Sequence, residues 1–200
     1  GLGLIGGSLA KALKRSQPDC RILAHTRSSE TLRAAASQGI IDEVCHSPGD
    51  PKFKECGYVF LCAPVGANIH ALEQLKDSVS PSCILTDVGS VKTEIHEAAA
   101  RIGMEGAFIG GHPMTGSEKS GILNSQAHLF ENSYYVITPT SKTDESRIQE
   151  YKELVSALGA LPIVMDYRQH DFITPAVSHL PHLIAPAPVN TVHAFDSKEE

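Results

Sequence analysis

The sequence lacks any pair of cysteines in a C-x-x-C arrangement, although it contains Cys20, Cys45, Cys56, Cys62 and Cys83. Their odd number and their spacing argue against a disulfide framework and against a zinc site, and favour a reducing compartment. No apolar run approaches the roughly 18 residues that a membrane-spanning helix needs. The sequence also shows no leader with a basic start and an apolar middle. We therefore expect a cytoplasmic protein that does not act at a membrane.

A run of basic residues is also absent. The formal net charge is -6 and the calculated pI is about 5.9, so the chain has no electrostatic footprint for nucleic acid or for an anionic membrane. With 200 residues, of which 42% are hydrophobic and 20% are charged, the composition is that of a globular protein with a sizeable core. Small molecules are the expected partners.

Short apolar runs rich in β-formers alternate with stretches of helical periodicity. Strands are expected at 21–26, 58–63, 82–88, 107–110, 134–138 and 161–165, and helices at 8–15, 30–38, 68–77, 92–101 and 144–158. This alternation is typical of an α/β fold with a Rossmann-type doubly wound, mainly parallel sheet. Gly39 and Gly159 stand where helices are expected to end in a left-handed cap.

The opening residues have the pattern G-x-G-x-x-G and lead into an amphipathic helical stretch. Glycines at these positions permit a tight turn and a close approach of the backbone to a pyrophosphate, which the helix N-terminus attracts. Alone this pattern is weak, but the strand at 21–26 ends where a dinucleotide site reads the adenosine ribose. The predicted cofactor site includes Gly1, Gly3, Leu4, Ile5 and Gly6. The central first strand of such a sheet is expected before Gly1, which makes the sequence a piece of a longer protein.

Thr26, Arg27 and Ser28 are expected to contact that ribose. An NAD-selective site carries Asp or Glu here, because a carboxylate accepts hydrogen bonds from the 2′-hydroxyl. In this sequence no acid repels a 2′-phosphate, and a guanidinium and two hydroxyls can bind it, so NADP is favoured over NAD. Alternatively, Arg27 is a solvated surface charge.

Small or polar residues follow the next two expected strands, in the segments FLCAPV (60–65) and TDVGSVK (86–92). Because α/β sheets bind ligands at the carboxyl ends of their strands, Cys62, Ala63, Pro64 and Ser90 are added to the predicted cofactor site. A reactive thiol at Cys62 is less favoured than a small buried residue.

A third segment, GGHPMTGSEKSG (110–121), is the most specific part of the sequence. Together with 1–10, 61–65, 87–92, 135–139 and 178–184, it resembles, in the same order, the motifs of prephenate dehydrogenases, which are enzymes of tyrosine biosynthesis. The resemblance spans essentially the whole chain. It implies NAD(P)-dependent oxidative decarboxylation of prephenate to 4-hydroxyphenylpyruvate, with arogenate dehydrogenase as the alternative.

The resemblance also implies roles for single residues. His112 would contact the ring hydroxyl of the substrate with support from Ser90, while Ser117, His179 and His182 would line the substrate pocket. The chemistry agrees, because removal of hydride from a carbinol carbon requires an acceptor for the hydroxyl proton, and imidazole titrates in the useful range. The alternatives are a structural His112, and packing or metal ligation by the other two histidines, for which no acid or cysteine lies at ligand spacing. The remaining histidines have no comparable context and are assigned no role.

The resemblance divides the chain at residue 166. Residues 1–166 are expected to form the dinucleotide-binding domain, and 167–200 the beginning of an α-helical domain that in this family forms the homodimer and supplies an arginine for a substrate carboxylate. Pro186 and Pro188 depart from the family pattern, since a proline inside a helix costs about 3 kcal/mol. A break is therefore expected near Pro186.

Two further functions stay open. A 3-hydroxyacid dehydrogenase of similar architecture would normally carry a lysine base on the later helix, but Lys198 is the only lysine between 168 and 200. A module that binds NADP without catalysis would not require a proton acceptor at His112 with Ser90 beside it. Both functions are therefore less favoured than a prephenate or arogenate dehydrogenase.

Overall fold

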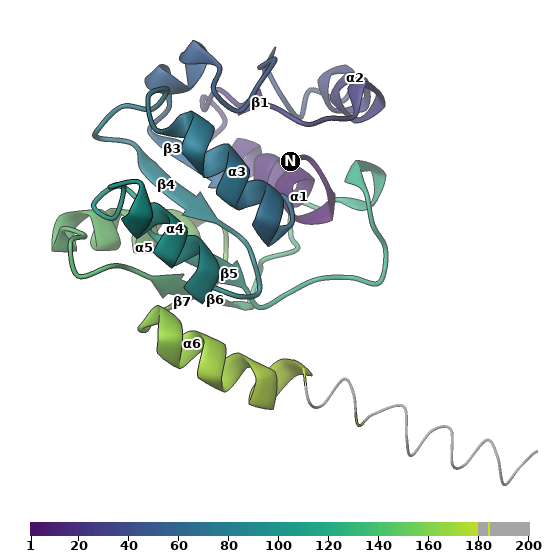
Figure 1. Cartoon of the computed structure of the whole chain (residues 1–200). Coiled ribbons are helices and arrows are strands. Elements are labelled where there is room, and N and C mark those ends of the chain that lie inside the picture. Colours follow the sequence, from purple (N-terminus) through teal and green to yellow (C-terminus); the bar gives the residue numbers. More distant parts are fainter. Residues whose placement is uncertain (180–183, 185–200) are drawn as a thin grey trace, which may run out of the picture.

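The computed structural model describes residues 1–179 and residue 184, except for the side chains of 178 and 179. Strands and helices alternate along the chain, and the helices lie on both faces of the sheet (Figure 1). The strands are β1 (Leu23–Ala24), β2 (Glu43–Val44), β3 (Tyr58–Leu61), β4 (Ile84–Asp87), β5 (Gly110–Pro113), β6 (Tyr134–Thr138) and β7 (Leu161–Val164). The helices are α1 (Leu4–Ser16), α2 (Ser29–Ser37), α3 (Val65–Leu75), α4 (Thr93–Arg101), α5 (Glu145–Ala157) and α6 (Tyr167–Thr174), with short helical turns η1 (Pro51–Glu55), η2 (Ile122–Asn124) and η3 (Pro175–His179).

Parallel pairing dominates the sheet. β1 pairs with β2, β3 with β4 and β6 with β7, all in parallel. A parallel bridge between Leu85 and Phe108 connects β4 to the chain just before β5. Only β5 and β6 run antiparallel among the described strands, with Gly110 opposite Thr138. The fold is therefore the expected Rossmann-type α/β sheet, mainly parallel.

The two faces of the sheet bury alternate residues of the same strands. Val59 and Leu61 of β3 belong to a cluster with side chains of α3 and α4. Phe60 of the same strand packs on a second cluster, which contains side chains of α1 and α5. Successive side chains of a strand point to opposite faces, and this alternation places a helical layer on each side.

One expected strand is wrong in its position. The strand expected at 107–110 is found at Gly110–Pro113, so His112 lies inside β5. Residues 107–109 bond instead to β4, because the Leu85 amide donates to the Ala107 carbonyl (3.0 Å) and the Ile109 amide donates to the Leu85 carbonyl (2.9 Å). The chain then leaves β4 and pairs with β6, a change of partner that no local pattern encodes.

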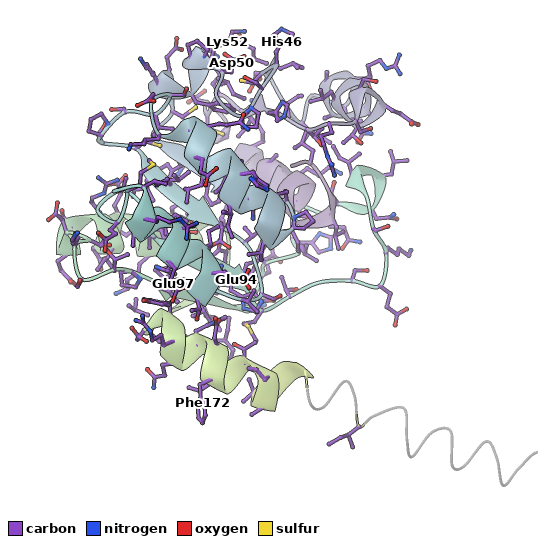
Figure 2. The ribbon with its side chains drawn as sticks, viewed as in Figure 1. His46, Asp50, Lys52, Glu94, Glu97 and Phe172 are labelled. Carbon is purple, nitrogen blue, oxygen red and sulfur yellow. The ribbon has the colours of Figure 1, made fainter. Side chains whose placement is uncertain are left out.

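The bounds of the other elements agree with those expected from the sequence to within a few residues, with three kinds of exception. The strand expected at 21–26 is reduced to β1, and α1 begins at Leu4 instead of Ser8 and takes two glycines into its first turns. β2, η1 and η2 were not expected; Asp50 stabilises the loop between β2 and η1 by accepting hydrogen bonds from the His46 and Lys52 amides (Figure 2). The left-handed caps are confirmed, with φ of 64° at Gly39 and 85° at Gly159.

Helix α6 docks on α4 through polar and aromatic contacts. Asp171 accepts hydrogen bonds from the Lys92 and Thr93 amides at the start of α4, both 2.8 Å long. The Tyr167 ring stacks on His96, with 4.3 Å between the ring centroids. Phe172, on another face of α6, is 84% exposed (Figure 2). No helix in the described part of the chain is long and apolar enough to cross a membrane.

The buried His96 gives the fold a dependence on pH. Desolvation, with a smaller contribution from Lys92, lowers its pKa from 6.5 to about 4. Between pH 6.5 and pH 4, His96 is therefore protonated in the unfolded chain and neutral in the folded chain. The free energy of unfolding consequently falls as the pH drops through this range. The expected loss is roughly 3 kcal/mol.

Urea unfolding between pH 7 and pH 4 measures this loss. The matched variant His96→Gln does not titrate, and its amide can still bond to Thr138, whose hydroxyl lies 2.9 Å from His96 Nε2. We expect a shallower pH dependence for the variant. Equal slopes for the two proteins would show that His96 is not the group responsible.

Candidate functional site

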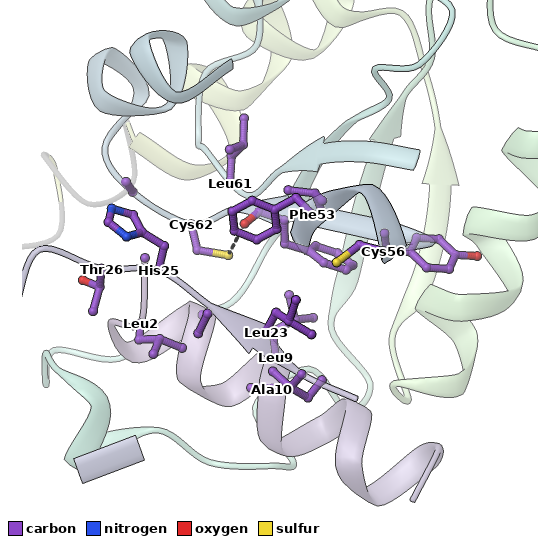
Figure 3. A pocket seen from close by; sticks show the side chains of 18 of the residues that line it. Leu2, Leu9, Ala10, Leu23, His25, Thr26, Phe53, Cys56, Leu61 and Cys62 are labelled. Atoms are coloured by element: carbon purple, nitrogen blue, oxygen red, sulfur yellow. Dashed lines mark hydrogen bonds between the residues drawn. The ribbon is translucent and has the colours of Figure 1, made fainter. Parts of the chain in front are cut away.

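A cavity of about 760 Å³ lies beside the glycine turn. Its lining includes Gly1, Gly3, Thr26 and Arg27, together with apolar side chains of α1, β1 and β3. Figure 3 shows Thr26 at one end of the cavity and Cys56 at the other. The structure therefore brings most of the predicted cofactor residues around one hollow.

The glycine turn fits a pyrophosphate. An ideal Cβ at Gly6 would lie 2.2 Å from the Gly1 carbonyl oxygen, so only glycine allows the turn to close. A Cβ at Gly3 would meet no heavy atom of the described chain within 4 Å, which leaves open space beside the N-cap of α1. Leu4 and Ile5 form the first turn of that helix, whose amides attract an anion.

The segment predicted to contact the ribose, Thr26 to Ser28, is only partly as expected. Thr26 and Arg27 line the cavity, and Arg27 is exposed. Ser28 serves as the N-cap of α2, because its Oγ accepts a hydrogen bond from the Thr31 amide (3.1 Å). Its hydroxyl proton can still be donated, so this cap is compatible with a phosphate contact.

The turn after β3 is held by a residue that the sequence reading missed. The buried Asn68 side chain accepts a hydrogen bond from the Ala63 amide and donates one to the Leu61 carbonyl, each 3.0 Å long. This clamp fixes the backbone of Cys62, Ala63 and Pro64 at the rim of the cavity. Desolvation raises the pKa of the Cys62 thiol to about 11, which agrees with a small unreactive residue there. An asparagine in the first turn of a helix is the signal that could have identified the clamp.

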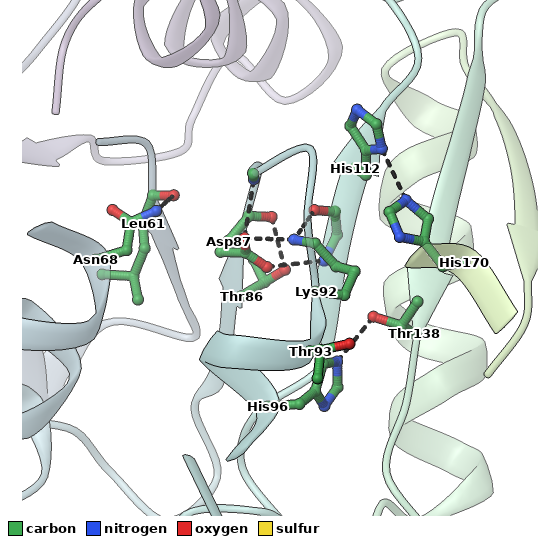
Figure 4. Close-up of polar contacts among 12 residues, drawn as sticks. Leu61, Asn68, Thr86, Asp87, Lys92, Thr93, His96, His112, Thr138 and His170 are labelled. Atoms are coloured by element: carbon green, nitrogen blue, oxygen red, sulfur yellow. Dashed lines mark hydrogen bonds and ion pairs between the residues drawn. The ribbon is translucent and has the colours of Figure 1, made fainter. Parts of the chain in front are cut away.

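His112 belongs to a chain of three side chains that connects β5 to α6. Its Nδ1 lies 2.9 Å from Nε2 of His170 (Figure 4). Nδ1 of His170 in turn lies 2.8 Å from Oδ1 of Asp171. Both imidazoles are buried. His170 had been assigned no role from the sequence, because its contact with His112 spans 58 residues.

Asp171 determines which nitrogen of each of the two imidazoles donates a hydrogen bond and which accepts one. Desolvation acts to raise its pKa, but hydrogen bonds from Thr93, His170 and Lys92 outweigh it and lower the pKa. A carboxylate can only accept, so Nδ1 of His170 carries the proton and Nε2 of a neutral His170 accepts. His112 then donates from Nδ1, and its Nε2 becomes the basic nitrogen. This is the tautomer that a proton acceptor requires.

A buried ion pair holds the residue before His112. The ammonium group of Lys92 pairs with Asp87 and donates to the Gly111 carbonyl (2.7 Å), and both side chains of the pair are fully buried. Oδ1 of Asp87 accepts a hydrogen bond from the Gly111 amide (3.2 Å). An ideal Cβ at Gly111 would lie 2.7 Å from the Asp87 carbonyl oxygen, which explains the glycine. Desolvation lowers the pKa of Lys92 while Asp87 opposes the shift.

The other predicted catalytic and substrate-binding residues are exposed on loops or lie outside the described part of the chain. Ser90 is exposed on the loop between β4 and α4. Ser117 lies on an exposed loop, where its Oγ accepts a hydrogen bond from the Lys119 amide (3.2 Å). The His179 side chain and the whole of His182 lie outside the described residues. The roles of all four stay predictions.

The hydrogen-bonded side chains of Asp171, His170 and His112 form a relay, which can be tested by replacing His170 in its middle. For His170→Asn in the complete protein we expect kcat to fall roughly 10- to 100-fold, the usual effect of losing a partner that orients a functional histidine. KM should change little. The acidic limb of the pH–rate profile should move to lower pH, because a base without carboxylate support takes up protons less readily. A variant with the wild-type profile and rate would show that the relay is only structural.

Comparisons with known proteins place the chain in one family. The family model described as "Prephenate dehydrogenase, nucleotide-binding domain" matches residues 9–164. A prephenate dehydrogenase of Bacillus subtilis is 37% identical over 195 residues, which cover 96% of this chain and 52% of the relative. The chain thus spans about half the length of the curated relatives that it matches first.

Solved structures agree with this assignment. The crystal structure of prephenate dehydrogenase from A. aeolicus in complex with hydroxyphenyl propionate and NAD+ is 35% identical, with a TM-score of 0.86 over 96% of this chain and 68% of that one. Synechocystis arogenate dehydrogenase is 34% identical, with a TM-score of 0.84 over 96% of this chain and 66% of that one.

Proposed function

We propose, because the chain belongs to the prephenate dehydrogenase family, that the complete protein catalyses the NAD(P)-dependent oxidative decarboxylation of prephenate to 4-hydroxyphenylpyruvate. The observation that supports this proposal most strongly is the hydrogen-bonded chain from Asp171 through His170 to His112. It provides an oriented base in a chain that also carries a glycine turn fit for a dinucleotide. A protein that only stored the nucleotide would have no need of such a base.

His112, His170 and Asp171 have separate roles in the proposed reaction. When bound, the nicotinamide accepts the hydride from the carbinol carbon of the substrate. Nε2 of His112 takes the hydroxyl proton, and the resulting carbonyl conjugates with the ring. The bond between the ring and its carboxylate then breaks and carbon dioxide leaves. The electron pair of that bond moves through the ring to the carbonyl oxygen, which makes the ring aromatic, and this oxygen takes the proton back from His112. His170 and Asp171 stabilise the positive charge that His112 gains.

The remaining substrate contacts are part of this proposal. Ser90 would orient His112 or the substrate hydroxyl, and Ser117, His179 and His182 would line the substrate pocket. The position of Ser90 on the loop directly after β4 supports its role, since β4 ends at the same edge of the sheet as the cavity residues of β3.

For the cofactor, the fit of the glycine turn supports binding of NAD(P), and the absence of an acid at 25–28 supports NADP as an accepted nucleotide. The apolar part of the cavity lies between β1 and β3, whose facing edges pair with no strand in the described part of the chain. We propose this gap as the place of the first strand expected before Gly1. The division at residue 166 also stays a proposal, supported by the start of α6 at Tyr167.

We further propose a cytoplasmic homodimer that forms through the helical part of the complete protein. The exposed apolar side chains of Phe172 and Val177 support this proposal, because a dimer that covered them would remove apolar surface from water. The five free cysteines support a reducing location.

Reduction of NAD+ and NADP+ by the complete protein tests the proposed reaction. Prephenate and arogenate are offered separately, and the release of carbon dioxide is measured alongside. We expect turnover with prephenate and equal amounts of reduced nucleotide and carbon dioxide. Turnover with arogenate alone would identify the alternative activity. Tight nucleotide binding without turnover of either substrate would favour a non-catalytic module.

A further inference from the structure

His25 lies between the end of β1 and Thr26 to Ser28, the segment predicted to contact the adenosine ribose. β1 ends at Ala24, and His25 is half-buried and lines the same cavity as Thr26 and Arg27. Figure 3 shows the His25 and Thr26 side chains next to each other at one end of this cavity. The imidazole is therefore part of the wall that an adenosine ribose would meet.

A backbone contact fixes the tautomer of this imidazole. Nδ1 of His25 lies 3.1 Å from the carbonyl oxygen of Cys45, the residue that follows β2. A carbonyl oxygen can only accept, so the ring donates from Nδ1. In the neutral ring Nε2 then carries the lone pair and acts as an acceptor. The contact also limits rotation of the ring, since Cys45 is buried and its backbone is fixed by pairing with Ala24 (2.8 Å).

A hydrogen-bond acceptor is what this segment otherwise provides poorly. The four residues 25–28 contain no carboxylate, and Arg27 can only donate. The other side-chain acceptors are the hydroxyls of Thr26 and Ser28, and the Ser28 oxygen already accepts from the Thr31 amide. A ribose 2′-hydroxyl is a donor and needs an acceptor, whereas a 2′-phosphate needs donors and positive charge. A neutral imidazole accepts from the hydroxyl without the repulsion that a carboxylate exerts on a phosphate.

We propose that His25 helps to determine the specificity for NAD and NADP at the adenosine ribose. Nε2 of His25 accepts a hydrogen bond from the 2′-hydroxyl of NAD, while Arg27 binds the 2′-phosphate of NADP. The binding site therefore takes both nucleotides through different side chains. This inference rests on the proposed function only in assuming that the end of the cavity at Thr26 and Arg27, outside the gap assigned to the first strand, binds the adenosine part of a dinucleotide.

Calorimetric titration of the complete protein with NAD+ and with NADP+ tests the division. We expect His25→Ala to weaken NAD+ binding roughly 3- to 10-fold, the equivalent of one neutral hydrogen bond, with a smaller effect on NADP+. Arg27→Ala should do the reverse and weaken NADP+ by about 10-fold or more. His128→Ala, at an exposed histidine outside the cavity lining, is the matched control and should change neither affinity.

A second variant keeps the test independent of the bond to Cys45. His25→Asp introduces the carboxylate typical of NAD-selective sites, so it should retain NAD+ and weaken NADP+ about 10-fold or more. The proposal is overturned if wild-type protein binds only one of the two nucleotides, or if His25→Ala and His25→Asp leave the ratio of affinities unchanged. Wild-type protein that binds neither nucleotide would overturn the proposed function as well, whereas binding without turnover would count against the catalytic proposal alone.

Discussion

Replacement of His112 by asparagine is expected to lower kcat of the complete protein by roughly 10² to 10⁴, the usual contribution of a positioned acid or base. The physical reason is the relay in which Asp171 and His170 leave Nε2 of His112 as the basic nitrogen. An asparagine amide is of similar size but cannot take up a proton at neutral pH. Steady-state reduction of the nucleotide with prephenate measures the loss.

Nucleotide binding separates a lost base from a damaged fold. The affinity of the His112→Asn variant for NAD(P)+ should stay close to wild type, because the glycine turn consists of residues before and in the first turns of α1, whereas His112 belongs to β5. His128→Asn, at an exposed position, is the matched control and should keep full activity. Wild-type turnover by the His112 variant would contradict the assignment of the base.

Loss of Asp87 is expected to produce the largest change in stability. In Asp87→Ala the ammonium group of Lys92 stays fully buried without its counter-charge, and breaking a buried pair in this way costs about 3 to 5 kcal/mol. The Gly111 and Gly89 amides lose their acceptors in the same variant. Urea unfolding of the complete protein should show the decrease as a lower midpoint.

Two controls identify the buried charge as the cause. The double variant Asp87→Asn with Lys92→Met removes both charges and keeps an acceptor for the Gly111 amide, so it should recover much of the lost stability. Lys142→Met breaks an exposed pair with Glu105 and should change the free energy of unfolding by less than about 1 kcal/mol. If Asp87→Ala cost no more than Lys142→Met, the pair would not stabilise the fold.

The parts of the site that the sequence predicted are those with local causes. The glycine turn is predictable because Gly1, Gly3 and Gly6 constrain a single turn and the helix that follows it. The cavity residues of β3 are predictable because apolar runs mark strands, and the carboxyl ends of parallel strands meet at one edge of a sheet. The helix caps at Gly39 and Gly159 depend only on the ends of their own helices.

The parts that the sequence did not predict depend on contacts between distant segments. β5 begins three residues later than expected because the chain changes from β4 to β6 as its partner. Lys92 resembles a solvated helix residue until the fold buries it against Asp87 and Gly111. His170 reaches His112 only when α6 docks on α4, and the adjacent acid at Asp171 was the one sequence signal for this contact.

A crystal structure of the complete protein with nicotinamide nucleotide and 4-hydroxyphenylpyruvate provides the sharpest test of His112 as the base. We expect Nε2 of His112 to lie about 2.6 to 3.2 Å from the phenolic oxygen. His170 and Asp171 should be hydrogen-bonded behind it, and the ring carbon that bears the oxygen should face the nicotinamide. A phenolic oxygen held by other side chains, with the His112 imidazole beyond the reach of a hydrogen bond or a single bridging water, would contradict it.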